Sequence, residues 1–240
     1  MSTIGHLKDR LPPSVSIPLR SLLRRAKGMP AGLTHREVSR LLAKQSPTIL
    51  EIGCNNGDDT LALLREMPLV KLYCFEPDPR AIRRFKENLS ASLPRVTLTE
   101  VAVSDRNGTV DFYASSGGEM PEGWDQSGSI RKPTGHLTEW PWVKFEKTIA
   151  VETCRLDDWR ADNGIEDVDF IWMDVQGAEG DVVAGATKTL ERTSFLYTEY
   201  SDTPNYQGQL SLKELLARLP RFKVMARYPG DVLLRNRSLS

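Results

Sequence analysis

Short apolar runs alternate along this chain with segments in which apolar residues recur every three or four positions. From residue 47 onward the apolar runs predict strands, and the periodic segments predict helices. The predicted strands cover residues 47–53, 70–78, 95–105, 168–175 and 194–200, and the predicted helices cover residues 58–67, 79–93, 179–191 and 211–219. This alternation is typical of an α/β fold, a doubly wound and mostly parallel sheet with helices on both faces.

Two turn sequences predict antiparallel pairing. Residues 222–228 and 231–236 are strand-like, and only a Pro-Gly dipeptide separates them, so we expect a C-terminal antiparallel hairpin. Asn107-Gly108 is a hairpin-turn dipeptide, and it predicts that residues 106–115 fold back on the strand before them.

Residues 1–40 differ from the rest of the chain in their charge. Basic side chains outnumber acidic ones there, although the whole chain has a formal net charge of zero. Residues 18–28 predict a short helix, and residues 34–44 predict a second helix that begins at Thr34 with a capping box to Glu37. A basic helical segment of this kind suits weak contact with an anionic membrane surface, packing as a cover on the core, or a homodimer contact.

An irregular stretch interrupts the pattern between residues 114 and 148. It is rich in Gly, Ser and Pro, and it carries Trp124, Trp140 and Trp142. A loop of this length in a compact domain is usually functional or disordered. The tryptophans suit either stacking on an acceptor or packing of the loop on the sheet. We expect a basic helical extension at residues 1–45 and one domain at residues 46–240 with a loop insertion near 114–148.

Composition narrows the class of protein. The 240 residues suit one sizeable domain, and the 40% hydrophobic and 27% charged fractions are ordinary for a globular protein. The zero net charge and the lack of a basic stripe in the core predict no nucleic-acid partner. No apolar run approaches the ~20 residues of a membrane span. Three cysteines without a C-x-x-C pair fit a reducing, cytoplasmic location.

The candidate chemistry begins at the turn after the first strand, where Gly53 and Gly57 bound the sequence GCNNG and two acids, Asp58 and Asp59, follow it. The lysine of a P-loop is missing, and a dinucleotide motif aligned here would set Asp58 against the pyrophosphate. Two unit charges ~4 Å apart repel by roughly 4 kcal/mol at an effective dielectric of 20, whereas the helix dipole offsets only ~0.3–1 kcal/mol. The turn therefore favours a cationic adenosine compound, S-adenosylmethionine, over NAD or FAD, with the two glycines allowing close approach of the backbone.

Glu76 supports a cofactor that contains adenosine, whether S-adenosylmethionine or a dinucleotide. It ends the next predicted strand, about 20 residues beyond the glycine turn, where nucleotide folds place the carboxylate that binds the ribose. A solvated acid at a strand end is the alternative interpretation.

Four sequence blocks together resemble one known family. The blocks ILEIGCNNG, CFEPDPRAIRRFKENL, VAVSDRNGTVDFY and VDFIWMDVQGAE, in this order, resemble the FkbM-type S-adenosylmethionine-dependent methyltransferases over about residues 45–235. The resemblance implies a seven-stranded Rossmann-like methyltransferase fold and O-methylation of sugars, polyketides or other hydroxylated metabolites. This chain has Gln176 where the family more often has a glutamate in the block D-V-E-G-A-E.

The same resemblance implies a set of cofactor contacts. Around the methionine end it implies Glu51, Gly53, the backbone of Cys54, and Asn55, and at the ribose it implies Glu76. Around the adenine it implies Ala102, Val103 and Ser104, with Asp105 near the adenine amino group.

Methyl transfer to a hydroxyl requires a general base or a metal that helps to remove the acceptor's proton. Asp174 ends the nearly all-apolar run VDFIWMDV, which predicts a central strand, and open α/β sheets bind ligands at the carboxyl edge. Glu199 ends the following strand, so the two acids suit a base or hard oxygen ligands for Mg²⁺. His136, in the insertion, is the other candidate base. A structural Asp174 bonded to loop N–H groups is the alternative.

These features predict an S-adenosylmethionine-dependent O-methyltransferase acting on a hydroxyl of a sugar, a glycan or a small metabolite. A catalytically silent module would bind the cofactor without turnover on any hydroxylated acceptor. A nicotinamide-dependent oxidoreductase is a third hypothesis, which the position of Asp58 disfavours.

Overall fold

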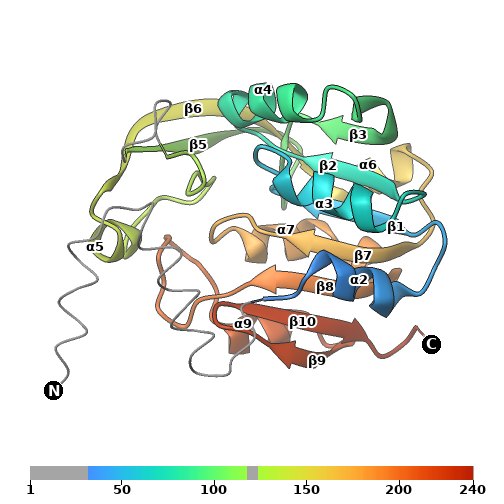
Figure 1. Ribbon diagram of the computed structural model, residues 1–240. Coiled ribbons are helices and arrows are strands. Elements are labelled where there is room, and N and C mark those ends of the chain that lie inside the picture. Colours follow the sequence, from blue (N-terminus) through green and yellow to red (C-terminus); the bar gives the residue numbers. More distant parts are fainter. Residues whose placement is uncertain (1–31, 118–123, 240) are drawn as a thin grey trace, which may run out of the picture.

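The computed structural model describes residues 32–117 and 124–239 (Figure 1). The predicted helix at residues 18–28 lies outside the described residues, and so do most of the side chains behind the membrane and dimer hypotheses. The second predicted helix is α2 (His35–Leu42), and it begins with the predicted capping box between Thr34 and Glu37.

The main sheet has seven strands in the order β3-β2-β1-β7-β8-β10-β9. These strands are β1 (Thr48–Ile52), β2 (Lys71–Phe75), β3 (Val96–Thr99), β7 (Val168–Met173), β8 (Thr193–Glu199), β9 (Phe222–Arg227) and β10 (Asp231–Asn236). The first five of these pair in parallel, while β10 runs antiparallel to both β8 and β9. The sheet confirms the predicted fold class, including the C-terminal antiparallel hairpin.

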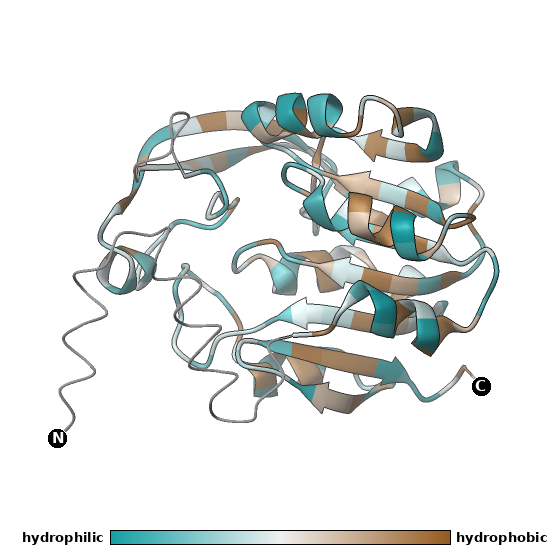
Figure 2. Ribbon diagram, in the orientation of Figure 1, coloured by the Kyte–Doolittle hydropathy of each residue, from teal (hydrophilic) through white to brown (hydrophobic). Residues whose placement is uncertain are grey.

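Helices cover both faces of the main sheet. The helices on one face are α2, α3 (Asp58–Glu66) and α4 (Pro79–Asn88), and those on the other are α6 (Leu156–Asp162), α7 (Glu179–Gly185), α8 (Thr187–Glu191) and α9 (Leu212–Arg218). Two short helices, η2 (Leu93–Arg95) and α5 (His136–Glu139), lie in connections. Hydrophobic residues concentrate in the central strands, whereas the outer surface of α4 is largely hydrophilic (Figure 2).

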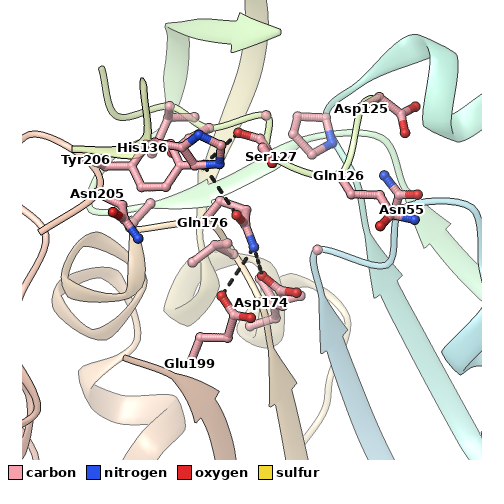
Figure 3. A pocket seen from close by; sticks show the side chains of 18 of the residues that line it. Asn55, Asp125, Gln126, Ser127, His136, Asp174, Gln176, Glu199, Asn205 and Tyr206 are labelled. Carbon is pink, nitrogen blue, oxygen red and sulfur yellow. Dashed lines mark hydrogen bonds between the residues drawn. The ribbon is translucent and has the colours of Figure 1, made fainter. Parts of the chain in front are cut away.

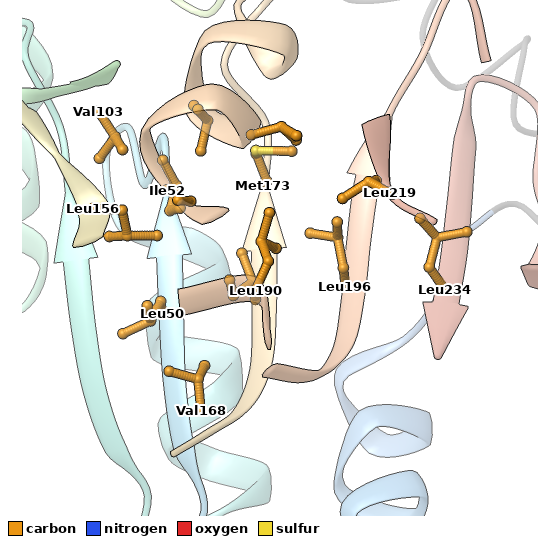
Figure 4. Close-up of a cluster of buried hydrophobic side chains, with 14 of the residues drawn as sticks. Leu50, Ile52, Val103, Leu156, Val168, Met173, Leu190, Leu196, Leu219 and Leu234 are labelled. Carbon is orange, nitrogen blue, oxygen red and sulfur yellow. The ribbon is translucent and has the colours of Figure 1, made fainter. Parts of the chain in front are cut away.

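Alternate residues of β1 are buried in two hydrophobic cores, one on each face of the main sheet. Leu50 and Ile52 of β1 are buried against α6, α7 and α8, where they meet Leu156 and Leu190 (Figure 4). Ile49 points to the opposite face of the sheet and is buried in the cluster with side chains of α2, α3 and α4. Because both faces are covered, the strand is apolar almost throughout, as parallel strands in such folds usually are.

The predicted hairpin at Asn107-Gly108 is wrong. A second sheet has the order β4-β6-β5, formed by β4 (Ala102–Ser104), β5 (Gly108–Gly117) and β6 (Val143–Arg155). The long strand β6 lies between β4 and β5, parallel to the first and antiparallel to the second. The turn therefore connects two strands that are not neighbours in the sheet. The strand β6, which is distant in sequence, forms the hydrogen bonds with β5 that a local hairpin would have formed with β4.

The strand predicted at residues 95–105 and the helix predicted at residues 179–191 are each divided in two. The strand contributes β3 to the main sheet and β4 to the second sheet. The helix is interrupted at Ala186 between α7 and α8. A Cβ on Gly185 would lie 1.9 Å from the carbonyl oxygen of Ser104, so the end of α7 packs directly against β4.

The second sheet and its connection lie beyond the carboxyl edge of the main sheet, on the left in Figure 1. The connection after β5 is held by isolated bridges between Tyr113 and Ser129 and between Pro133 and Tyr206. It therefore joins the segment 200–209 that follows β8. Within the described residues, we find no helix of the length and apolarity that crossing a membrane requires.

Candidate active site

A cavity of about 690 Å³ opens at the carboxyl edge of the main sheet. The ends of four parallel strands reach it, at Ile52, Phe75, Asp174 and Glu199. The other wall comes from residues 124–143 of the insertion and from residues 200–209 after β8. The cavity thus lies where open α/β folds place their ligands.

The glycine turn forms one end of this cavity. The backbone N–H groups of Gly53 and Cys54 both donate to the carbonyl oxygen of Phe75, at 2.9 and 3.1 Å, so the turn is fixed to β2. Gly53, Cys54 and Asn55 line the cavity. Gly57 does not line it, because this residue faces Phe85 and Leu89, whose side-chain atoms would lie 2.8 and 2.4 Å from an added Cβ.

Glu76 is fixed beside the turn. Its carboxylate accepts hydrogen bonds from the backbone N–H groups of Asn55 at 2.9 Å and Asp78 at 2.8 Å. The side chain is buried, and burial raises the pKa of Glu76 to about 8 despite these two donors. The position suits a carboxylate that accepts hydrogen bonds from ribose hydroxyls.

Asp58 and Asp59 begin α3 and line the same end of the cavity. The side chain of Asn56 donates to Asp58 at 2.9 Å, and His35 of α2 lies 3.0 Å from Asp59. His35 in turn stacks on Trp172, with ring centroids 5.0 Å apart. Negative charge is therefore held next to the turn, where a cationic ligand is favoured and a pyrophosphate is repelled.

The structure separates the predicted cofactor residues into two groups. Ala102 and Val103 line the cavity, next to Val101. The residues that do not line it are Glu51, Gly57, Ser104 and Asp105. Glu51 lies beneath the turn, where the Thr60 hydroxyl donates to it at 2.6 Å, and burial raises its pKa to about 8.

Asp174, Gln176 and Glu199 form a hydrogen-bonded cluster in the same cavity, where the end of β7 packs against the glycine turn (Figure 3). The Gln176 amide nitrogen donates to Asp174 Oδ1 at 2.6 Å and to Glu199 Oε2 at 3.2 Å. Burial raises the pKa of Asp174, and burial together with the neighbouring Asp174 charge raises the pKa of Glu199 well above its usual range. Two such carboxyl groups retain a proton between them more readily than exposed acids do.

His136 begins α5 and lines the cavity, although the residue is only 5% exposed. Its ring lies among Trp140, Phe145 and Tyr206. Burial lowers the pKa of His136, which favours the neutral imidazole. Among the described residues, its buried Nδ1 atom has no hydrogen-bond partner. The structure therefore brings the two candidate bases, His136 and Asp174, to one cavity.

The three tryptophans of the insertion also line the cavity. Trp142 makes edge contacts with Trp124 at 5.1 Å and with Trp140 at 6.3 Å between ring centroids. The Trp124 indole N–H donates to the Ser127 hydroxyl at 2.9 Å, which fixes this ring to the insertion. The tryptophans thus both pack the loop and face the ligand space.

Several residues of the cavity wall carry no sequence signal that predicts them. They are Asp125, Gln126, Ser127, Asn205, Tyr206 and Gln209. All lie in irregular segments, where hydrophobic periodicity does not predict the position of a residue in the folded structure. Their place follows from long-range contacts, such as the hydrogen bonds from the backbone of Thr134 and His136 to the carbonyl oxygen of Asn205.

Comparison with known proteins gives one family and one similar relative. The family model described as "Methyltransferase FkbM domain" matches residues 51–227. The "2-O-methyltransferase NoeI" of Sinorhizobium fredii (strain NBRC 101917 / NGR234) is 53% identical over 209 residues, which cover 85% of this chain and 86% of the relative.

Two solved structures are similar to this chain at low sequence identity. An O-methyltransferase from Bacillus cereus in complex with SAH is 16% identical, with a TM-score of 0.49 over 97% of this chain and 96% of that chain. An rRNA methylase from Streptococcus thermophilus is 15% identical, with a TM-score of 0.46 over 83% of this chain and 93% of that chain.

Proposed function

The chain belongs to the FkbM methyltransferase family and is an S-adenosylmethionine-dependent O-methyltransferase, and we propose that it methylates an uncharged, hydroxylated acceptor that Asp174 deprotonates. The hydrogen-bonded cluster of Asp174, Gln176 and Glu199 at the end of β7 is the observation that carries this proposal. The cluster offers a buried acid in the cavity whose glycine turn suits the cofactor.

We assign the glycine-turn end of the cavity to S-adenosylmethionine. Its donor set fits this group, because Glu76 offers carboxylate oxygens for ribose hydroxyls, and Asp58 and Asp59 offer negative charge for an ammonium group. Ala102 and Val103 offer an apolar surface for the adenine. The bound cofactor supplies an electrophilic methyl group, and the residues around it supply position, which accounts for much of the acceleration in such displacements.

At the acceptor end, we propose that Asp174 accepts the proton of the acceptor hydroxyl. A base must lie within hydrogen-bond reach of that proton and must be ionised. The Gln176 amide stabilises the ionised form of Asp174, while Glu199 retains the proton that the pair shares. His136 is the alternative base, since its ring lines the same cavity and its low pKa favours the neutral form.

The charge of the wall disfavours an anionic acceptor. Among the described residues, the cavity wall includes Asp58, Asp59, Glu76, Asp125, Glu139, Asp174, Glu199 and Asp231, but no lysine or arginine. Arg84 pairs with Asp125 from outside this wall. A phosphate ester bound near these acids would be repelled, whereas a neutral sugar ring would stack on Trp124, Trp140 or Trp142.

The similar relative suggests the position of the methyl group. That protein is called a 2-O-methyltransferase, and it is 53% identical over 209 residues. We propose that this chain likewise methylates the hydroxyl at position 2 of a sugar or a glycan.

We propose that the reaction needs no Mg²⁺. Asp174 and Glu199 are hard oxygen donors, but one oxygen of each already accepts a hydrogen bond from the Gln176 amide nitrogen. Within the described residues, no group of three or more His, Cys, Asp or Glu side chains is arranged to hold a metal. A cation between the two acids would have to displace this amide.

The test is turnover on a panel of neutral sugars, glycosides and polyols with S-adenosylmethionine, followed by linkage analysis of the methylated product. We expect one member to yield a 2-O-methyl product in stoichiometric amounts with S-adenosylhomocysteine. Cofactor binding without turnover on the whole panel would instead favour a silent binding module. Calorimetry with NAD provides a control, because binding of NAD alone would contradict the cofactor assignment.

A further inference from the structure

We propose that Tyr206 is a positioning residue for the methyl transfer: its hydroxyl orients the Gln176 amide toward Asp174 and Glu199 and ties this cluster to Ser127 of the insertion. The proposal rests on the proposed function of Asp174 as the base. Tyr206 lies in an irregular segment 30 residues from Gln176 and 79 residues from Ser127.

The contacts of Tyr206 connect three separate parts of the chain. Its single hydroxyl proton is shared between two acceptors, the backbone carbonyl of Ser127 at 2.8 Å and the side-chain oxygen of Gln176 at 3.3 Å (Figure 3). Its backbone forms a bridge with Pro133, and the residue is only 2% exposed. Tyr206 is therefore held in place on both sides and has little freedom to leave the cluster.

The ring of Tyr206 also packs on the turn that carries Gln176. Gln176 has a φ of 51°, and the next residue, Gly177, has a φ of 91°. A Cβ on Gly177 would lie 2.7 to 2.9 Å from atoms of the Tyr206 side chain. The ring therefore fills the space that the glycine leaves, and it supports a backbone conformation that costs energy for a residue such as Gln176.

An amide has a donor end and an acceptor end, and the partner of one end decides where the other points. With the Gln176 oxygen toward the Tyr206 hydroxyl, the nitrogen faces Asp174 at 2.6 Å and Glu199 at 3.2 Å. Rotation of this amide would turn its oxygen toward the carboxylate oxygens, where two acceptors repel each other. The hydroxyl thus favours the amide orientation that supports an ionised Asp174.

Ser127 links this orientation to the wall of the cavity. Its N–H donates to the Ser115 hydroxyl at 3.1 Å, its hydroxyl accepts from Trp124, and its carbonyl accepts from Tyr206. Ser127 and Trp124 both line the cavity. The Tyr206 hydroxyl therefore fixes the position of the insertion relative to Asp174 and Glu199.

The test is a double-mutant cycle with Tyr206→Phe and Gln176→Met. The first variant removes only the hydroxyl, and the second keeps the length of the side chain but removes the amide. We expect Tyr206→Phe to lower kcat about five- to tenfold, as for the loss of one buried hydrogen bond, with the Kd for S-adenosylmethionine within about twofold. In the Gln176→Met background, the same change should cost less than about twofold. Equal losses in both backgrounds, or an unchanged kcat, would overturn the proposal.

A pH profile separates positioning from general loss of structure. Asp174 loses support for its charged form when the amide is free to rotate, so the acidic limb of kcat should move to higher pH in Tyr206→Phe. The other titratable groups that act on the pair are Asp59 of α3, Glu179 of α7 and Asp231 of β10, and they are unchanged in the variant. An unshifted limb would contradict the proposal.

The matched control is Tyr73→Phe. Tyr73 packs against Trp159 and does not line the cavity, so this change should leave kcat and the pH profile unaltered. A crystal structure of Tyr206→Phe provides a measurement that needs no acceptor. We expect the Gln176 nitrogen to lose its contact with at least one of the two carboxylates, and an unmoved amide would refute the proposal even if the identity of the base were wrong.

Discussion

Gly53 and Asp174 meet so closely that a Cβ on Gly53 would lie 1.8 Å from the carbonyl oxygen of Asp174. The backbone N–H of Asp174 also donates to the carbonyl oxygen of Ile52 at 2.9 Å. The turn assigned to the cofactor and the end of the strand assigned to the base are therefore one packed unit. A displacement of either backbone is transmitted directly to the other.

Gly53→Ala should abolish detectable cofactor binding and lower the melting temperature, because the new methyl group meets the backbone of Asp174 at a φ of +87°. Isothermal titration with S-adenosylhomocysteine and a thermal melt measure the two effects. The matched control is Gly164→Ala, at a φ of +62° with nothing within 4 Å of an added Cβ. A variant at Gly53 that binds as well as this control would contradict the close packing.

Asp174→Asn should lower kcat by roughly 10²–10⁴, the usual contribution of a general base, while the Kd for S-adenosylmethionine changes little. Burial raises the pKa of Asp174, so in the parent enzyme the protonated, inactive fraction falls as the pH rises through that pKa. The acidic limb of the rate profile should be lost in the variant.

The comparison variant is His136→Gln, which should lower kcat by less than about tenfold. The opposite ranking of the two variants in kcat would assign the base to His136.

Glu51→Gln should reduce the pH dependence of stability. Burial raises the pKa of Glu51 to about 8 from a usual value of 4.5, so the folded state keeps a proton that the unfolded state loses between these values. The contribution of Glu51 to the free energy of unfolding is thus complete below pH 4.5 and declines as the pH rises toward 8. Urea denaturation at pH 5 and pH 8 should show a smaller difference for the variant, and an unchanged difference would argue against a buried, protonated Glu51.

A phosphate ester of the preferred acceptor should react at least tenfold more slowly in kcat/KM than the neutral compound. The acids in the cavity wall repel the phosphate, and two unit charges 4 Å apart interact by roughly 4 kcal/mol at an effective dielectric of 20. Raising the ionic strength from about 0.01 to about 1 M should narrow the difference by screening. Equal rates for both compounds would show that the acceptor's charge is not recognised.

Activity should persist in a chelator. The Gln176 amide nitrogen donates to both Asp174 and Glu199, so a cation held by these two acids would have to displace the amide. The measurement is turnover after dialysis against EDTA, with and without added Mg²⁺. Loss of turnover that Mg²⁺ restores would establish a metal-assisted reaction.

The sequence alone determined the features that depend on near neighbours in the chain. The order of the main-sheet strands along the chain, the capping box at Thr34, the final hairpin and the glycine turn between β1 and α3 all follow from periodicity and turn chemistry within about ten residues. The resemblance of four blocks to the FkbM family is confirmed by the family model over residues 51–227.

Only the tertiary structure decided which distant segments meet. The turn at Asn107-Gly108 predicted a local hairpin, but β6 lies between β4 and β5. Likewise, no local pattern brings Tyr206 to Gln176, and no local pattern shows that burial raises the pKa of Asp174. The physical reason is that backbone propensity acts over a few residues, whereas strand pairing, desolvation and side-chain contacts depend on the position of the whole chain in space.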